Sequence, residues 1–215
     1  MIERISGYDP RNGALIFRVY TEEIPDTERR LRNRLSHLTA SDLLGAAMLR
    51  DFGIRHVRIH RIGLGKPQLL HENLHMNLTH CTGLAAAAAG TVPLGIDAEV
   101  PRTVKEKLLP RLCTQEETVL IQCAEDKNLM FSRLWTLKES YAKFTGEGIG
   151  LDFSKLGFTP GNSPVFHHPA SGEVQFYQII LNNHHVVSLC VPRGDYEIVT
   201  AVTEKNRKED DYAVD

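Results

Sequence analysis

The chain has 215 residues, 42% of them hydrophobic, so it is long enough to bury the core of one large domain or of two small ones. Its 25 Lys and Arg residues against 27 Asp and Glu give a formal net charge of -2, which argues against a protein that binds nucleic acid through a global positive field. Four cysteines without a CxxC pair predict buried, neutral thiols in a reducing compartment. The charged first residues lack the apolar run of a signal peptide, and no window is long enough to span a membrane. We therefore expect a cytoplasmic protein without a membrane partner.

Two amphipathic helices are expected in the first quarter of the chain. Residues 25–38 can begin at a cap on Asp26 or Thr27 and place leucines on one side, with arginines opposite. Residues 39–53 repeat the pattern and end at a glycine. Residues 55–63 then alternate aliphatic and basic residues, which predicts a strand.

Three short runs near the middle of the chain predict strands, at residues 74–80, 83–90 and 93–100. The second run contains five consecutive alanines, which favour helix intrinsically. Its flanking glycines and its brevity permit a buried strand. We expect the strand on the basis of the family resemblance given below.

The second half begins with helices and ends with strands. Residues 114–124 open with Thr114 and Glu117 at the spacing of a capping box, and a longer helix is expected from about Asp126 to Gly146. Three β-branched, alternating segments are typical of an antiparallel sheet, at residues 173–181, 184–192 and 196–202.

This order of elements predicts an α+β protein of two comparable halves joined between Pro93 and Pro101. We expect an N-terminal half at residues 1–95 and a C-terminal half at residues 96–204. The charged residues 205–215 are expected to form a solvated tail.

The segment GIDAEV carries the first candidate site. On a strand, Asp97 and Glu99 project from one face while Ile96 and Ala98 face the other way. Two neighbouring carboxylates repel each other unless a cation neutralises them, and Mg²⁺ binds one or two carboxylates while leaving positions for water and phosphate. The same spacing also fits two exposed acids at the end of a strand, so both interpretations stay open here.

The segment LWTLKESYAK carries the second candidate site. Glu139 and Lys143 are four residues apart, so they lie on one face of a helix, where such pairs are usually surface ion pairs. Trp135 lies one turn earlier on that face, which indicates the wall of a cleft more than a fully solvated ridge.

Four short motifs, in order, resemble those of the Sfp-type 4'-phosphopantetheinyl transferases: GKP at 65–67, NLTHC at 77–81, GIDAEV at 95–100 and WTLKESYAK at 135–143. The resemblance covers most of the chain, from about Leu43 to Phe158. The tryptophan makes the last motif more similar to the W/KEA branch, although Ser140 replaces the alanine of that name.

The resemblance implies a pseudo-dimer of two similar α+β halves with the active site in the cleft between them. It implies that Asp97, Glu99 and Glu139 are ligands of Mg²⁺. It also implies that Lys143 and several other residues contact coenzyme A: Lys66, Pro67, Thr79 and His80.

One position departs from the family pattern. Members usually carry an arginine just before the LLG-like segment, whereas this chain has Ser41 and Asp42 there, and an aspartate would repel a phosphate. We expect Arg30 or Arg34, one turn apart on the preceding helix, to take over the contact with the 3'-phosphate.

The resemblance implies an enzyme that transfers phosphopantetheine from coenzyme A to a serine of an apo acyl or peptidyl carrier protein and releases 3',5'-ADP. Glu139 and Lys143 are the expected catalytic residues, with Glu139 as candidate general base, and the pseudo-dimeric chain is expected to act as a monomer. Two alternatives remain: a coenzyme A or carrier-binding protein with weakened catalysis, and another Mg²⁺-dependent phosphate-transfer enzyme.

Overall fold

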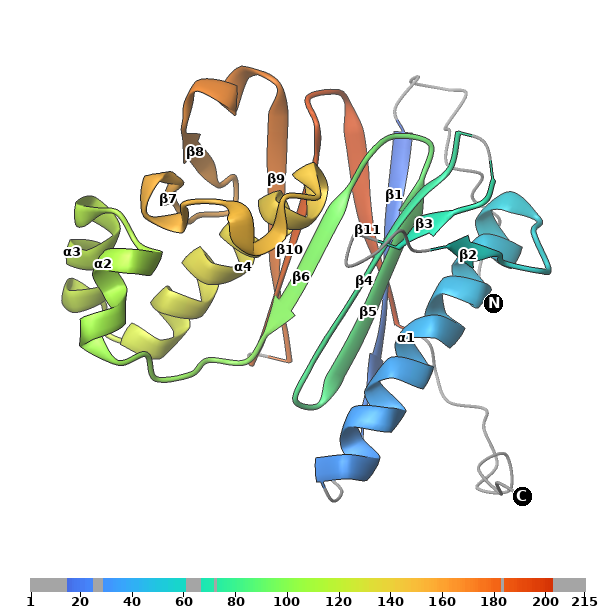
Figure 1. Cartoon of the computed structure of the whole chain (residues 1–215), viewed down its shortest axis with the longest axis horizontal. Coiled ribbons are helices and arrows are strands. Elements are labelled where there is room, and N and C mark those ends of the chain that lie inside the picture. The colour runs from blue at the N-terminus through green and yellow to red at the C-terminus, as the bar shows by residue number, and fades with distance from the viewer. Residues whose placement is uncertain (1–14, 25–28, 61–66, 72, 183, 203–215) are drawn as a thin grey trace.

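The computed structural model describes residues 15–24, 29–60, 67–71, 73–182 and 184–202. Two β-sheets lie side by side, with one long helix packed on each (Figure 1). This arrangement confirms the α+β fold class. In the described part of the chain, no helix is long and apolar enough to cross a membrane.

The first sheet has four strands in the order β11-β1-β5-β4 and packs against helix α1. Its elements are β1 (Leu15–Glu23), α1 (Arg29–Phe52), β4 (His75–Cys81), β5 (Leu84–Gly90) and β11 (Tyr196–Val202). The short strands β2 (Ile59–His60) and β3 (Gln68–Leu69) pair with each other between α1 and β4.

The second sheet has three strands in the order β6-β10-β9 and packs against helix α4. Its elements are β6 (Gly95–Glu99), α4 (Lys127–Thr145), β9 (Val174–Leu181) and β10 (His185–Pro192). The remaining elements surround α4 or lie at the end of β9: η1 (Glu106–Leu108), α2 (Leu109–Leu112), α3 (Gln115–Cys123), η2 (Gly148–Gly150), η3 (Phe153–Lys155), β7 (Gly157–Thr159), β8 (Val165–His167) and η4 (Pro169–Gly172).

The alanine run forms strand β5, as expected, and all its residues are buried. Alternate alanines enter two cores: Ala85, Ala87 and Ala89 join the cluster beneath α1, while Ala86 and Ala88 join a cluster shared with β6 and β10. Because side chains alternate across a strand, small residues at every position let both neighbouring layers approach closely. The helical propensity of alanine is therefore overridden by packing on both faces.

The two sheets meet where β4 runs beside β6 (Figure 1). Side chains from β4 satisfy backbone donors of β6. The Asn77 Oδ1 accepts a hydrogen bond from the Ile96 amide at 2.9 Å, and the Thr79 Oγ1 accepts one from the Ala98 amide at 3.3 Å. The two halves are thus joined by a seam of side chain–backbone bonds, which fixes β4 relative to β6.

The two helices predicted for the second half, α3 and α4, begin and end as expected, whereas the short helix α2 was not predicted. Thr114 and Glu117 form both bonds of a capping box at the start of α3. Asp126 caps α4 by accepting a hydrogen bond from the Leu129 amide, and α4 ends at Gly146, whose φ of 80° favours glycine.

Two predictions about the order of elements are wrong. The two helices expected over residues 25–53 are one continuous helix, α1, because no glycine or proline separates them and Ser41 bonds back to the His37 carbonyl instead of capping a new helix. Residues 196–202 do not extend the antiparallel sheet of β9 and β10, because they pair in parallel with β1. Strand β1 itself was not predicted.

Several other expectations have mixed outcomes. The thiol of Cys123 is exposed and Cys81 is only partly buried, so the prediction of buried thiols is wrong for Cys123. The expected caps at residues 26 and 27, Lys66 and the tail at residues 205–215 lie outside the described residues. The division at residues 95 and 96 stays a prediction, and β11 crosses it to complete the first sheet.

Candidate active site

Strand β6 presents its carboxylates and its apolar residues on opposite faces. Ile96 and Ala98 enter the core that β6 shares with β5 and β10. Asp97 projects to the other face, where it forms an ion pair with Lys143 of α4. Because side chains alternate along a strand, Glu99 belongs to the same face as Asp97.

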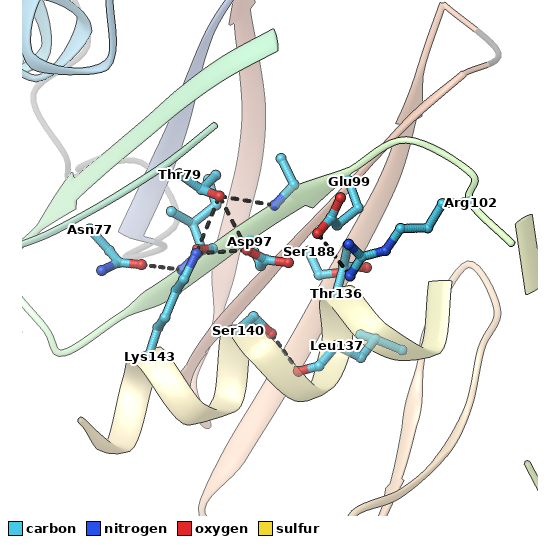
Figure 2. Close-up of polar contacts among 12 residues, drawn as sticks. Asn77, Thr79, Asp97, Glu99, Arg102, Thr136, Leu137, Ser140, Lys143 and Ser188 are labelled. Carbon is cyan, nitrogen blue, oxygen red and sulfur yellow. Dashed lines mark hydrogen bonds and ion pairs between the residues drawn. The ribbon is translucent and has the colours of Figure 1, made fainter. Parts of the chain in front are cut away.

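Asp97, Thr79 and Lys143 converge at the seam between the two halves (Figure 2). The Lys143 ammonium lies 2.7 Å from the Asp97 Oδ1 and donates to the Thr79 Oγ1 at 3.2 Å and to the Ile96 carbonyl at 3.0 Å. The Thr79 hydroxyl is 3.1 Å from the same carboxylate oxygen. Thr79 of β4 in the first half thus forms a single polar cluster with Asp97 of β6 and Lys143 of α4 in the second half.

The approach of α4 to β6 depends on Gly95. A Cβ atom at this position would lie 2.1 Å from the Ser140 carbonyl oxygen and 2.4 Å from the Phe144 amide nitrogen. Both neighbours are backbone atoms of α4, so they cannot move aside independently of the helix. The glycine therefore sets how closely Lys143 can approach the strand.

Glu99 lies at the end of β6 and pairs with Arg102, whose guanidinium is 3.3 Å from a Glu99 carboxylate oxygen. The Arg102 guanidinium lies 6.0 Å from the ring centroid of Trp135 on α4. Trp135 is itself half-buried against Phe131 and Phe153. The helix face that carries Trp135 is therefore packed, as its sequence indicated.

Glu139 belongs to the same electrostatic group as the two acids of β6. Burial raises the pKa of Glu139, and the neighbouring charges of Asp97 and Glu99 raise it further, while Lys143 and Arg102 oppose the shift. Burial and Asp97 likewise raise the pKa of Glu99 against the effect of Arg102. Three carboxylates from β6 and α4 thus interact in one place, where negative charge is disfavoured.

The donor types suit a hard cation, although the side chains are not arranged as a ligand set. Among the described residues, no three His, Cys, Asp or Glu side chains are grouped as metal ligands would be. The Asp97 Oδ2, however, is buried and accepts no hydrogen bond from the described residues. A buried carboxylate oxygen without a partner is unfavourable, and a cation shared with Glu99 and Glu139 would satisfy it with the oxygen ligands that Mg²⁺ prefers.

His80 follows Thr79 on β4 and contacts a histidine that the sequence did not single out. The rings of His80 and His37, which projects from α1, are 4.5 Å apart between centroids and meet edge to face. Burial lowers the pKa of His80, and His37 and Lys143 lower it further. Two imidazole rings thus lie close to the Lys143 ammonium beside the seam, where N–H groups could donate hydrogen bonds to a phosphate.

Of the two arginines expected to replace the missing family arginine, only Arg34 has a described side chain. Arg34 is exposed on α1, one turn before His37, whereas the side chain of Arg30 lies outside the described residues. The Ser41 hydroxyl donates to the His37 carbonyl within the helix and is solvent-exposed. The sequence analysis did not identify His37, because this residue lies outside the family motifs. Only its contact with His80 in the folded chain points to it.

A cavity of about 590 Å³ opens next to the C-terminal end of α4. Its walls come from residues between 67 and 76, from Pro93 and from Phe144 to Gly146 at the end of α4. Pro67 of the GKP motif lines it, as does His71, whose Nε2 is buried without a hydrogen bond to the described residues. Phe144, the residue after Lys143, is part of the wall, whereas Asp97, Thr79 and Lys143 are not.

Lys138, the third charge of the LWTLKESYAK segment, lies apart from this site. Its side chain is fully buried and pairs with Glu117 of α3, which the sequence marked only as a helix cap.

The model of a protein family matches residues 93–200, half of the chain, and is described as the 4'-phosphopantetheinyl transferase superfamily. The chain belongs to this superfamily. Among curated relatives, the 4'-phosphopantetheinyl transferase psf-1 of Bacillus pumilus is 33% identical over 97 residues, which cover 44% of this chain and 42% of psf-1. The 4'-phosphopantetheinyl transferase HetI of a Nostoc strain is 37% identical over 106 residues, which cover 45% of each chain.

The chain spans about half the length of these relatives. Among solved structures, the holo-[acyl-carrier-protein] synthase of Thermotoga maritima is 25% identical, with a TM-score of 0.39, over 47% of this chain and 62% of that one. The matched superfamily region includes β6 and α4, and therefore Asp97, Glu99, Glu139 and Lys143.

Proposed function

We propose that this protein transfers the 4'-phosphopantetheine group of coenzyme A to a serine of an apo acyl or peptidyl carrier protein and releases 3',5'-ADP. The observation that carries the proposal is the convergence of Asp97, Thr79 and Lys143 at the seam between the halves. A cavity of about 590 Å³ lies at the end of α4, the helix that carries Lys143. A cavity of this volume is in the range of small-molecule sites. Membership of the transferase superfamily supports the same reaction.

Asp97, Glu99 and Glu139 would hold the divalent cation. The Asp97 Oδ2, which has no partner among the described residues, and the raised pKa values of Glu99 and Glu139 support this assignment, because a cation relieves both. Bound Mg²⁺ would supply neutralising charge at the pyrophosphate of coenzyme A.

Side chains of the chain itself would bind the phosphates and orient the nucleotide. Lys143 already lies in the polar cluster and can donate to a pyrophosphate oxygen. His80, whose lowered pKa favours the neutral ring, can donate one N–H, and the His37 ring lies beside it. The cavity beyond Lys143 would take the nucleotide, with Pro67 in its wall and Lys66 as a further phosphate contact. Arg34, and Arg30 before it, remain candidates for the 3'-phosphate.

The reaction needs a base and a stabilised leaving group. The serine oxygen forms a bond to the β-phosphorus while the bond from that phosphorus to the leaving 3',5'-ADP breaks. We assign the serine proton to Glu139, because this carboxylate belongs to the same electrostatic group as Asp97 and Glu99, where the incoming hydroxyl would meet the phosphate. Lys143 would offset the negative charge that develops on the phosphates.

The partners of the protein are then coenzyme A and a carrier protein. We propose that the chain acts as a monomer, since both halves of the site come from one chain: Thr79 from the first half, Asp97 and Lys143 from the second. A cytoplasmic location remains part of the proposal, on the same sequence grounds as before.

The experiment combines the protein with coenzyme A, Mg²⁺ and several apo carrier proteins, and weighs each carrier by mass spectrometry. A phosphopantetheine mass gain is expected. Glu139→Gln should abolish the gain while the circular dichroism spectrum stays that of the wild type, because the amide cannot accept the serine proton. The matched control is Glu125→Gln, which removes an exposed carboxylate just before α4 and should leave transfer unchanged.

Each outcome separates the candidate functions. No mass gain on any carrier would refute the transferase, and tight coenzyme A binding without transfer would favour the binding protein suggested by Ser41 and Asp42. An active and stable Glu139→Gln variant would refute the central role of Glu139.

A further inference from the structure

A second pair of opposite charges joins α4 to α3, and its lysine leaves α4 on a different side from the residues of the candidate active site. The Lys138 side chain is 1% exposed, as is that of Glu117 on α3, and the ammonium is 2.7 Å from the Glu117 Oε2. The ammonium also donates to the carbonyls of Phe153 at 2.7 Å and Leu156 at 2.5 Å. All three of its hydrogens therefore have acceptors.

The carboxylate of this pair is equally well satisfied. The Glu117 Oε2 also accepts a hydrogen bond from the Thr114 amide at 2.8 Å, which is one bond of the capping box of α3. The Glu117 Oε1 accepts one from the Phe158 amide at 2.8 Å. The pair thus binds α4 simultaneously to the start of α3 and to the segment from η3 to β7.

Stability alone does not account for burying these two charges. Taking an ammonium and a carboxylate out of water carries a large desolvation penalty, and an apolar pair of similar volume often serves the fold as well or better. Unlike apolar contacts, the hydrogen bonds of the ion pair depend on the relative orientation of the groups they join. Its hydrogen bonds to two other segments, the start of α3 and residues 153–158, are satisfied only at one rotation and one axial position of α4.

That rotation also determines where the residues of the candidate site point. Lys138 and Glu139 are neighbours, so at about 100° per residue they leave the helix on different sides, and Lys143 projects about 40° from Glu139. Lys138 faces α3 and the 153–158 segment, whereas Lys143 faces β6 and pairs with Asp97.

We propose that Glu117 and Lys138 are positioning residues that fix α4 so that Glu139 and Lys143 face the carboxylates of β6. This inference rests on the proposed transferase function. Gly95 holds the opposite side of α4 close to β6, so the helix is located from both sides. A displacement of about 1 Å at a reacting group can lower a rate about a hundredfold, so a fixed helix matters more for turnover than for folding.

The test is the double variant Glu117→Gln/Lys138→Met, in which no charge is buried and the glutamine can still serve in the capping box. We expect a cooperatively folded protein whose kcat is lower by about tenfold or more, because α4 is no longer fixed. Lys155→Met is the control, because this lysine belongs to an exposed ion pair with Asp152 and its loss should leave kcat unchanged.

A second readout is the fluorescence of Trp135, the only tryptophan of the chain, which lies on α4 between Arg102 and Phe153. We expect its emission maximum to shift in the double variant. A folded double variant with wild-type kcat would overturn the proposal. If the wild-type protein transfers nothing, the proposed function fails, and the Trp135 emission then decides: a shift supports positioning, and an unchanged maximum overturns it.

If the double variant does not fold, Glu117→Gln alone is assayed, since it keeps the Lys138 ammonium and both carbonyl acceptors. Its kcat is expressed per folded molecule, with the folded fraction taken from circular dichroism at low temperature. A lower value supports the proposal, and a wild-type value overturns it.

Discussion

The two ion pairs of α4 differ in how completely their polar atoms are satisfied. Lys138 and Glu117 are each 1% exposed and have hydrogen-bond partners for every ammonium hydrogen and both carboxylate oxygens. Lys143 and Asp97 are 27% and 9% exposed, and the Asp97 Oδ2 has no partner among the described residues. A saturated pair holds structure in place, while a pair with unused bonding capacity is ready to bind a ligand. The difference separates two lysines that the sequence presents five residues apart on one helix.

The largest expected effect is on stability, in Lys138→Met. Removing the ammonium leaves the Glu117 carboxylate buried without a counter-charge, which should lower the free energy of unfolding by about 3–5 kcal/mol. Lys143→Met should lower it by about 1–2 kcal/mol, because its site is closer to solvent, but should remove transfer activity. Urea denaturation followed by circular dichroism measures both. Equal losses of stability in the two variants would remove the distinction between the pairs.

A smaller loss of stability is expected from Gly95→Ala, which acts on the Asp97 side alone. The added methyl group would overlap the Ser140 and Phe144 backbone and push α4 away from β6, with a loss of about 1–3 kcal/mol. Transfer activity should fall further than stability, since Lys143 would be displaced from Asp97.

The control for this variant is Gly150→Ala, where a Cβ atom meets nothing within 4 Å. Thermal unfolding and the carrier assay are run on both variants. If Gly95→Ala kept full activity, the close approach of α4 to β6 would be irrelevant to the candidate site.

The smallest effect concerns two cysteines, one beside each pair. Burial, Glu99 and Asp97 raise the pKa of Cys81 to about 12, while burial raises the pKa of Cys113 to about 11 against the effect of Lys138. At pH 8, only about one molecule in ten thousand would carry a Cys81 thiolate and about one in a thousand a Cys113 thiolate. Both thiols should therefore resist alkylation below their raised pKa values.

Iodoacetamide labelling at pH 8, followed by peptide mass spectrometry, checks this expectation. The exposed Cys123 should be modified first and serves as the internal control. Rapid labelling of Cys81 at this pH would show that its surroundings are less buried and less negative than the structure indicates.

The sequence predicted those parts of the fold that local chemistry determines. The capping box of α3, the limits of α4 and the two-faced strand around Asp97 follow from nearby residues, and all three are present. The break expected near residue 39 was wrong, because Ser41 can bond within a helix as easily as it can cap one.

What the sequence could not predict depends on contacts between distant segments. The pairing of β11 with β1 joins residues about 180 positions apart, and the local sequence of neither strand identifies the strand with which it pairs. The contact of His37 with His80 and the ion pair of Glu117 with Lys138 are of the same kind. The candidate site residues came from motifs, whereas the groups that position them came only from the folded chain.

The parallel pairing of β1 with β11 also constrains the order of events during synthesis. Strand β1 leaves the ribosome early, but β11, its parallel neighbour, emerges only after the second sheet and the helices that pack around it. Until then, one edge of β1 lacks a hydrogen-bonding partner, and such an edge can pair with another chain. The nascent first half should therefore need shielding until β11 emerges, and a chain shortened before residue 196 should be prone to aggregation even with every candidate catalytic residue in place.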